Sequence, residues 1–201
     1  MVKDKLTQLH LKIGILALQG DFIEHYSILQ AIDVTPRLVK LPRDLAGLDG
    51  LIIPGGESTT IGKLAAAYDL IEPLKHFSQA HAIWGTCAGA IFLSKDAQRD
   101  QPLLNLMDIT VERNAFGRQI DSFEIDLTAP FLENGADEPY HAVFIRAPII
   151  KSVYGEADVL LTLPDGRIIA AQQDNLLATS FHPELTTDTR FHQYFVELAK
   201  S

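Results

Sequence analysis

Residues 82–89 read Ala-Ile-Trp-Gly-Thr-Cys-Ala-Gly, and they place Cys87, the only cysteine of this 201-residue chain, between two glycines. An apolar run leads into the Gly-x-Cys-x-Gly motif, and residues 88–93 after it read as a helix. A strand that bends this tightly into a helix favours flanking glycines and exposes the central side chain at the carboxyl end of the strand. The amino end of the helix favours negative charge on the sulfur. The motif predicts a nucleophilic cysteine on an α/β sheet; the alternative is a small buried core residue, as free cysteines commonly are.

The segment Ser-Phe-His-Pro-Glu at residues 180–184 offers the partners that a cysteine nucleophile requires. A base takes the proton of the nucleophile, and an acid holds the tautomer of that base and stabilises its cation. His182 is the candidate base, and Glu184 lies two residues on, so an extended backbone, which Pro183 favours, projects both side chains to one side. Taken alone, the pair also fits a solvated histidine and an acid that opens the last helix. Together with the cysteine motif, it predicts a Cys-His-Glu triad.

The first half of the chain alternates strand patterns with helical ones. Lys12–Leu18 is a near-continuous apolar run, which is typical of a parallel strand covered on both faces. Asp21 is a candidate cap for a helix whose apolar face includes Phe22, Ile23, Tyr26 and Leu29. Further strands are expected at residues 37–40, 48–54 and 82–84, and helices at 59–68, 72–80 and 88–93. This order predicts a doubly wound, flavodoxin-like α/β fold with a mostly parallel sheet, helices on both faces and reactive loops at the carboxyl ends of the strands.

The second half is richer in strand patterns. Strands are expected at residues 107–112, 122–127, 142–145, 159–163, 167–173 and 176–179, and a closing helix at 188–198. Pro164-Asp165-Gly166, between two of these strands, is a hairpin signal. These patterns predict antiparallel strands that extend the sheet. In the absence of repeats and linkers, residues 12–201 are expected to form a single domain after a short lead-in at residues 1–11.

Composition excludes several classes of partner. The chain carries 17 Lys and Arg against 26 Asp and Glu, a net charge of −9, and no basic cluster. Nucleic-acid binding rests on neutralising phosphates, so a nucleic-acid partner is not expected. No apolar run approaches the length of a membrane span, so no membrane partner is expected either. One cysteine excludes an intrachain disulfide, and the expected location is the cytoplasm.

Acyl transfer on a cysteine also requires donors for an oxyanion and a clamp for the substrate. The Ala88 N–H follows the nucleophile and is one natural oxyanion donor. The second is expected from the loop Pro-Gly-Gly-Glu-Ser at residues 54–58, because two glycines let backbone amides turn toward a ligand; the alternative is an ordinary turn in which Ser58 caps the next helix. Arg113 and Arg146 end predicted strands and are candidate partners for a substrate carboxylate, although each also fits a surface ion pair.

The remaining motifs carry no cofactor signal. The spacing of histidines and acids does not resemble a metal site, and no dinucleotide-binding glycine pattern is present, so no metal and no cofactor are expected. Five histidines are accordingly expected on helix surfaces or in loops: His25, His76, His81, His141 and His192.

Several motifs in the same order give the chain a family resemblance. They lie at residues 18–20 (Leu-Gln-Gly), 54–60 (Pro-Gly-Gly-Glu-Ser-Thr-Thr), 85–89, 113–119 (Arg-Asn-Ala-Phe-Gly-Arg-Gln), 121–124 (Asp-Ser-Phe-Glu), 144–148 (Phe-Ile-Arg-Ala-Pro) and 180–185. The elbow and the His-Pro-Glu segment resemble those of class I glutamine amidotransferases. The strings at 54–60 and 113–119 are narrower and resemble the glutaminase subunits of two-component pyridoxal 5′-phosphate synthases. The resemblance runs from about Lys12 to the C-terminus.

The resemblance implies roles for particular residues. It implies Cys87 as nucleophile, His182 and Glu184 as its relay, and Gly56 and Ala88 as the oxyanion hole. The glutamine-binding residues that it implies are Gly56, Glu57, Ser58, Arg113, Ile145 and Arg146. The implied reaction hydrolyses L-glutamine to glutamate through a thioester, and the implied partner is a ring-forming synthase subunit that accepts the ammonia for vitamin B6 synthesis. In this family the glutaminase is weak alone and is activated by docking on that partner.

Two other interpretations stay open at the level of sequence. One is a different cysteine hydrolase on a similar fold, such as a γ-glutamyl peptidase, against which the His-Pro-Glu segment speaks, since those relatives place their acid differently. The other is a non-catalytic subunit that keeps the fold only for assembly. A complete triad argues against that reading, because an inactive site has no physical need for all three groups.

Overall fold

The computed structural model describes residues 11–113 and 122–200 of the chain. The expected lead-in, apart from Leu11, and most of the motif at 113–119 lie outside the described residues. Within the described ranges, no helix is long and apolar enough to cross a membrane.

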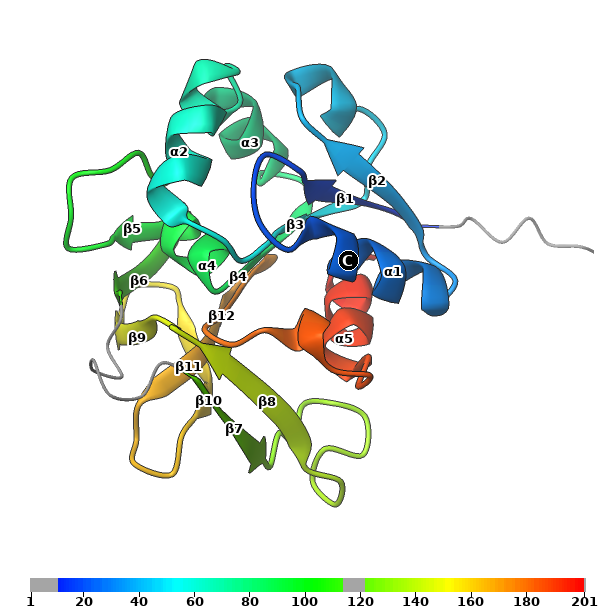
Figure 1. The fold of residues 1–201 in the computed structure, drawn as a ribbon, viewed down its shortest axis with the longest axis vertical. Coiled ribbons are helices and arrows are strands. Elements are labelled where there is room, and N and C mark those ends of the chain that lie inside the picture. Colours follow the sequence, from blue (N-terminus) through cyan, green and yellow to red (C-terminus); the bar gives the residue numbers. More distant parts are fainter. Residues whose placement is uncertain (1–10, 114–121, 201) are drawn as a thin grey trace, which may run out of the picture.

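A large sheet forms the centre of the molecule (Figure 1). Its parallel half has the strand order β2-β1-β3-β4-β12. The bounds are Lys12–Leu16 for β1, Thr35–Val39 for β2, Gly50–Ile53 for β3, Ala82–Thr86 for β4 and Leu176–Thr179 for β12. The last of these strands therefore lies next to the strand that ends at the cysteine. The order β2-β1-β3-β4 is the flavodoxin-like order predicted from the sequence.

The sheet continues beyond β12 with mostly antiparallel pairing, as the second half of the sequence predicted. The order is β12-β11-β9-β6-β5, and β10 pairs with β11; only β5 and β6 run parallel here. The bounds are Ser94–Asp96 for β5, Met107–Glu112 for β6, Ile149–Val153 for β9, Asp158–Thr162 for β10 and Ile168–Gln173 for β11. Strands β7 (Ser122–Leu127) and β8 (Tyr140–Ile145) form a separate antiparallel pair.

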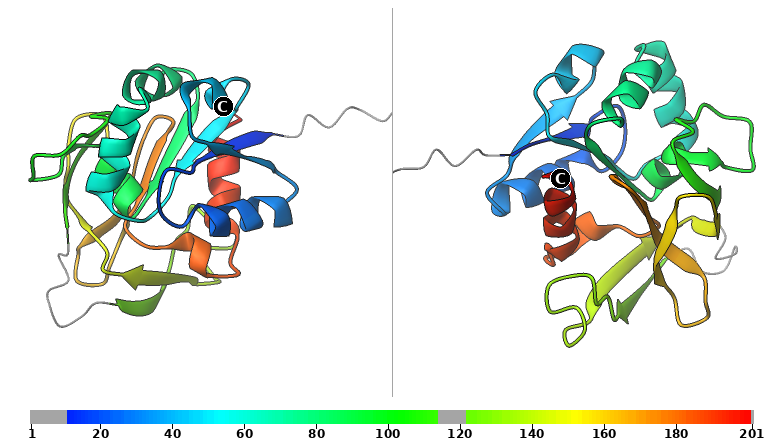
Figure 2. Two further views of the ribbon diagram at one scale, coloured as in Figure 1. Left: turned by 45° about the horizontal axis from the view of Figure 1, so that its top comes forward. Right: turned by 180° about the vertical axis from the view of Figure 1, so that it is seen from behind.

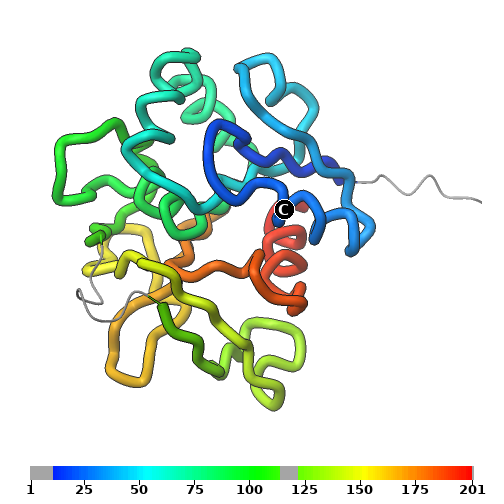
Figure 3. The backbone as a smooth tube through the Cα atoms, viewed as in Figure 1, coloured from blue at the N-terminus to red at the C-terminus, as the bar shows by residue number. Residues whose placement is uncertain are grey.

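Helices cover both faces of the sheet, and each face has its own hydrophobic core (Figure 2). One core packs under α1 (Phe22–Ala31) and α5 (Arg190–Leu198), and the other under α2 (Ser58–Ala67), α3 (Ile71–Phe77) and α4 (Ala88–Leu93). Two 3-10 turns, η1 (Pro42–Leu45) and η2 (Pro183–Leu185), complete the described elements. The backbone trace in Figure 3 shows α1 in blue beside α5 in red, so segments far apart in the sequence lie together.

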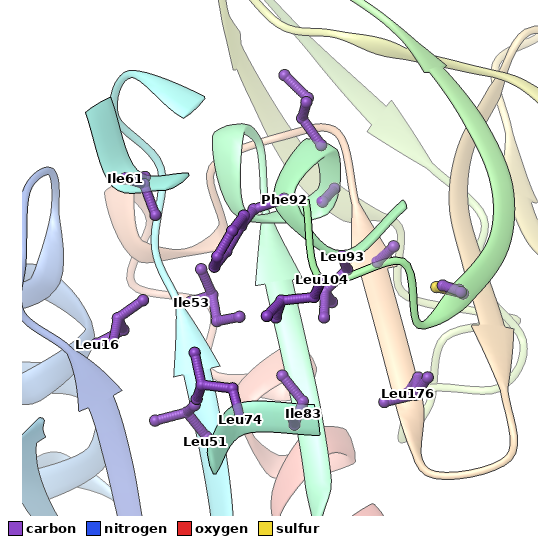
Figure 4. Packing of buried hydrophobic residues seen from close by; sticks show 14 of the residues in the cluster. Leu16, Leu51, Ile53, Ile61, Leu74, Ile83, Phe92, Leu93, Leu104 and Leu176 are labelled. Carbon is purple, nitrogen blue, oxygen red and sulfur yellow. The ribbon is translucent and has the colours of Figure 1, made fainter. Parts of the chain in front are cut away.

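Strand β3 shows how one buried strand serves both cores. Leu51 and Ile53 point into the core under α2 to α4, where Figure 4 shows them with Ile61 and Phe92 from the helices, while Ile52 points into the opposite core. All of these side chains are almost completely buried. Alternation of side chains along a strand that is covered on both faces explains the continuous apolar pattern in the sequence.

The sequence missed two strands and misassigned one helix cap. Strands β5 and β9 were not predicted, and β1 ends two residues before the predicted strand does. Asp21 stands at the start of α1 but makes no side-chain capping hydrogen bond. The predicted apolar face of α1 is also partly wrong, because Ile23 is 54% exposed while His25 is fully buried.

The elbow depends on close packing of α4 against β3. A methyl group added at Gly89 would overlap the carbonyl oxygen of Ile53, a backbone atom that the central sheet holds in place. We therefore expect Gly89→Ala to lower the free energy of unfolding by about 3 kcal/mol, a strong overpacking effect. Denaturant unfolding measures this. The matched control is Gly47→Ala, where the φ of +70° is strained but nothing lies within 4 Å of the new methyl group; its expected cost is only about 1 kcal/mol. Equal costs for the two variants would contradict the predicted overlap.

Candidate active site

Cys87 sits at the carboxyl end of β4 in a strained backbone conformation. Its φ is +48° and its ψ is −105°, values that a non-glycine residue rarely adopts. The Cys87 N–H donates to the carbonyl oxygen of Thr179, 2.8 Å away at the end of β12. Helix α4 begins at the next residue. The predicted strand-elbow-helix arrangement is confirmed, and its strain is what turns the side chain out of the sheet.

A cavity of about 610 Å³ opens over this elbow. The residues that the sequence singled out all line it: Gly56, Glu57, Ser58, Cys87, Ala88, Arg113, Ile145, Arg146 and His182; Glu184 lies behind His182. Gln19, Gly20, Asp21, Ile91, Pro148 and Leu185 also line it and were not predicted as site residues. The Leu-Gln-Gly motif directly after the first strand was the signal that pointed to the loop at 19–21.

His182 and Glu184 form a buried pair. The Nδ1 of His182 lies 2.6 Å from Oε1 of Glu184, and the two side chains are 6% and 0% exposed. The predicted extended backbone is wrong beyond His182, because Pro183–Leu185 forms the 3-10 turn η2. Proline suits the first position of a helical turn as well as an extended segment, which is why its effect was misjudged. The pair still meets, and Nδ1–H···Oε1 leaves Nε2 of His182 free for the thiol.

The electrostatics of the pair favour a charged imidazole. Burial by itself lowers the pKa of His182, but hydrogen bonds and charge from Cys87 and Glu184 outweigh burial and raise that pKa to about 11. Burial raises the pKa of Glu184, partly offset by its hydrogen bond to His182. A protonated His182 beside Cys87 can give its proton to a group that leaves from the reacting carbon.

Asp21 lies near the same ring nitrogen of His182 as Glu184 does. Its Oδ2 lies 3.7 Å from Nδ1 of His182, and its side chain is 42% exposed. Asp21, His182 and Glu184 thus present polar atoms within 4.8 Å of one another. The 2.6 Å hydrogen bond to Glu184 puts a proton on Nδ1, in the place that a cation would need. The arrangement is therefore that of an imidazole held by one near acid and one distant acid.

The two acids are expected to differ sharply in importance. Glu184→Gln replaces the acceptor of the Nδ1 proton with a group that stabilises an imidazolium poorly, and the expected loss in kcat is roughly 10⁴-fold, as for the acid of other triads. Asp21→Asn, the matched change at the half-exposed acid, is expected to cost less than about fivefold because solvent screens that contact. Initial rates of substrate hydrolysis measure both variants. A larger loss in Asp21→Asn would reverse the assignment.

Hydrogen bonds to the loop after β1 hold the loop after β3 in place. Gln19 Oε1 accepts a hydrogen bond from the Glu57 N–H at 2.7 Å, and the carbonyl oxygen of Gly55 accepts one from the Asp21 N–H at 3.2 Å. Gly56 has a φ of +146°, which a side chain would strain. These contacts fix the backbone of residues 55–57, of which Gly56 and Glu57 line the cavity together with Ala88.

Glu57 caps helix α2, a role that the sequence assigned to Ser58 as the alternative. Its carboxylate accepts hydrogen bonds from the Thr59 and Thr60 N–H groups, and its Oε1 lies 3.0 Å from Nη1 of Arg113. Burial opposes ionisation, but the hydrogen bonds from Thr60 and Thr59 prevail and lower the pKa of Glu57 to about 2. The cavity therefore presents a fixed negative charge beside a positive one.

Two of the histidines that the sequence placed on helix surfaces or in loops are fully buried. His25 on α1 and His192 on α5 are both 0% exposed, and their rings lie 2.9 Å apart, Nδ1 to Nε2. The prediction was wrong because it rested on residue type and on the lack of metal-site spacing, and did not ask which helix face packs inward. His76, His81 and His141 keep at least partial exposure.

The fold and the chemistry at the elbow define a class of protein: a flavodoxin-like sheet with a cysteine elbow facing a histidine–glutamate pair is the arrangement of class I glutamine amidotransferases. A family comparison bears this out. The model of the SNO glutamine amidotransferase family matches residues 15–201, and the chain belongs to that family.

Individual relatives agree with the family assignment. The chain is 54% identical over 191 residues to a pyridoxal 5′-phosphate synthase subunit PdxT of Herpetosiphon aurantiacus, covering 92% of this chain and 99% of that one. It is 53% identical to the PdxT subunit of a Roseiflexus species, with the same coverage. A crystal structure of a glutamine amidotransferase aligns with a TM-score of 0.87 at 44% identity, covering 94% of this chain and 99% of that one.

Proposed function

We propose that this chain is the glutaminase subunit of a pyridoxal 5′-phosphate synthase, which hydrolyses L-glutamine and passes the ammonia to a separate synthase subunit. The observation that carries the proposal is the meeting of Cys87, at the strained elbow, with the buried His182–Glu184 pair in one cavity. The relatives named as PdxT subunits, similar over nearly their whole length, supply the pathway and the partner.

The reaction follows from the placement of the protons. The Cys87 sulfur attacks the side-chain carbonyl carbon of glutamine, and His182 gives a proton to the departing nitrogen, which leaves as ammonia. The product is a γ-glutamyl thioester. Water then attacks the thioester carbon while His182 takes its proton, and the C–S bond breaks to release glutamate and the free sulfur. Glu184 keeps the imidazole in the required tautomer through both steps.

Each tetrahedral intermediate carries an oxyanion that needs donors. The Ala88 N–H, at the start of α4, and the Gly56 N–H, in the loop held by Gln19, line the same cavity and are the proposed oxyanion hole. Such donors are worth about 3 kcal/mol each in comparable enzymes. The proposal thus assigns binding of the oxyanion to backbone groups on both sides of the elbow.

The polar wall of the cavity fits a free amino acid. Arg113 suits the α-carboxylate of glutamine and Glu57 suits its α-ammonium group, since the two residues already lie 3.0 Å apart as an ion pair. Ser58, Ile145 and Arg146 line the remaining walls and are proposed to complete the glutamine site. A γ-glutamyl peptide carries the same two charged groups on its glutamyl residue. The site can therefore discriminate between glutamine and such a peptide only by the space that it leaves for the leaving group.

Arg113→Met tests this assignment. Removing the guanidinium leaves the α-carboxylate unpaired, so KM for glutamine is expected to rise by roughly 30-fold, which corresponds to a lost charge-assisted hydrogen bond of about 2 kcal/mol. The expected change in kcat is smaller than the change in KM, because Arg113 does not touch the reacting atoms. Steady-state kinetics measures both, with Arg43→Met, an exposed arginine on η1, as the matched control. An unchanged KM in Arg113→Met would remove Arg113 from the site.

The proposal also covers the domain and its location. The cavity draws on residues from Gln19 to Leu185, so we propose that residues 12–201 act as one glutaminase domain. A nucleophilic thiol works only when reduced, and we therefore propose a cytoplasmic location.

The test is glutamate release from glutamine by the purified chain, alone and with a pyridoxal 5′-phosphate synthase subunit added. The expected result is a low rate alone that rises on mixing. A high rate that the synthase subunit does not change would support a free-standing glutaminase instead. Hydrolysis of γ-glutamyl peptides in preference to glutamine would favour the peptidase, and no hydrolysis in either mixture would favour the non-catalytic assembly subunit.

A further inference from the structure

Two imidazoles that the proposed reaction does not use lie directly behind the triad. His25 and His192 come from α1 and α5, and their rings are fully buried against Trp84 of the elbow strand, with centroid distances of 5.8 and 5.0 Å. Polar groups are rarely buried without a reason, because each must recover the hydrogen bonds that it loses to water.

The two rings connect to the catalytic acid. His25 Nδ1 lies 2.9 Å from His192 Nε2, and His25 Nε2 lies 3.4 Å from Oε2 of Glu184, with both of those side chains 0% exposed. The other carboxylate oxygen of Glu184 is the one that holds His182. His25 Nε2 also lies 3.4 Å from Oγ1 of Thr86, the residue before the nucleophile.

The number of protons on the two rings determines which ring nitrogen of each histidine is protonated. Burial lowers the pKa of His25 well below its usual range and that of His192 to about 3, so both rings are neutral at pH 7 and each carries a single N–H. If His25 carried its proton on Nδ1, the lone pair of Nε2 would face the lone pairs of Glu184 Oε2. The favourable tautomer has the proton on Nε2, where it faces the carboxylate, and leaves Nδ1 to accept from His192 Nε2–H.

His192 completes the arrangement at the far end. With its proton on Nε2, its other ring nitrogen carries only a lone pair, and Nδ1 of His192 is indeed a buried atom without a hydrogen-bond partner among the described residues. Oε2 of Glu184 likewise makes no hydrogen bond of good geometry there, which leaves the His25 N–H as the donor that faces it. A buried carboxylate oxygen with no donor at all is costly.

We propose that His25 is a positioning residue for Glu184, and that His192 fixes the His25 tautomer that this requires. The pair orients Oε1 of Glu184 toward His182 and stabilises the ionised carboxylate, so the triad extends inward as a Cys87–His182–Glu184–His25–His192 series. The effect on catalysis rests on the proposed glutaminase function; the tautomer of His25 does not, and it is testable on the chain alone.

The direct test is long-range proton–nitrogen NMR on the full chain labelled with ¹⁵N-histidine. His25 and His192 are both expected as neutral rings protonated on Nε2 at pH 7. His192→Phe removes the donor to His25 Nδ1, and the expected result is a shift of His25 toward the Nδ1-protonated tautomer. A wild-type His25 already protonated on Nδ1, or a His25 unaffected by His192→Phe, would overturn the proposal even if the chain hydrolyses glutamine.

The kinetic test separates positioning from packing. His25→Phe keeps a ring but loses the donor, and kcat in the presence of the synthase subunit is expected to fall by roughly 10- to 100-fold with little change in KM, as for other residues that orient a catalytic group. His25→Gln keeps an N–H near the position of Nε2, and it is expected to restore most of the loss.

Trp84→Phe is the matched control for disturbed packing. Trp84 contacts both imidazoles, but its own N–H donates to Oγ1 of Thr179 and not to the series. Its kcat is expected to stay within about threefold of wild type even if its melting temperature falls as far as that of His25→Phe. Equal losses of kcat in Trp84→Phe and His25→Phe, or no rescue by His25→Gln, would show a merely structural role.

Discussion

Cys87→Ala is expected to abolish glutamine hydrolysis, with a loss in kcat of roughly 10⁴-fold or more, because the thioester cannot form without the sulfur. The fold is expected to persist, since the Cys87 side chain is small and the backbone hydrogen bond from Cys87 to Thr179 does not involve the sulfur. Glutamate release measures the loss, and circular dichroism and thermal unfolding measure the fold. Full activity in a folded Cys87→Ala chain would refute the covalent mechanism.

A second readout shows whether the loss is chemical. An electrophilic diazoketone analogue of glutamine is expected to add covalently to the wild-type chain and not to Cys87→Ala, because Cys87 is the only cysteine present. Intact-protein mass spectrometry detects the adduct. Binding to the synthase subunit is expected to survive in Cys87→Ala, since the sulfur lies at the bottom of a cavity and not on an exposed surface.

His182→Asn is expected to lose nearly as much activity as Cys87→Ala. Without the imidazole, the site lacks the group that takes the proton of the thiol, protonates the departing ammonia and takes the proton of water. One substitution therefore disables both halves of the reaction. The expected loss in kcat is again roughly 10⁴-fold, measured as glutamate release.

The double variant distinguishes a triad from two independent contributions. Because triad members act as a unit, Cys87→Ala combined with His182→Asn is expected to be no worse than Cys87→Ala alone. Multiplied losses would mean that the two residues act separately. His81→Asn is the control, since this partly exposed histidine lies in the turn before β4 and stacks on Phe77, away from the cavity.

The sequence predicted those strands whose local residue pattern determines their structure, and it predicted the elbow for the same reason. Strands β4, β6, β7 and β12 begin or end within two residues of the predicted positions, since each carries an apolar or alternating run. Strand β9 was missed because Lys151 and Ser152 interrupt its apolar pattern; its conformation depends on pairing with β6 and β11, which no local signal encodes.

Burial of polar groups was the weakest part of the sequence prediction. His25 lies three residues after Phe22 and four before Leu29, so helical periodicity put it on the inward face, yet residue type suggested a surface position. The contact between His25 and Glu184 joins segments 159 residues apart, and only the assembled sheet brings them together. The placement of Cys87 near the His182–Glu184 pair was predictable, because each of the two motifs directly follows a predicted strand.

The position of β12 has a consequence for the timing of activity during synthesis on the ribosome. Strand β12 is the last strand in chain order among the described residues, yet it lies in the interior of the sheet between β4 and β11, and it leads directly to His182 and Glu184. A nascent chain that has formed the elbow but not yet β12 lacks the base His182. In such a chain, the edge of β4 that pairs with β12 is still unpaired. Such long-range parallel pairing is slow to form. Ammonia release is therefore expected only after this late strand has inserted, which keeps incomplete chains from consuming glutamine.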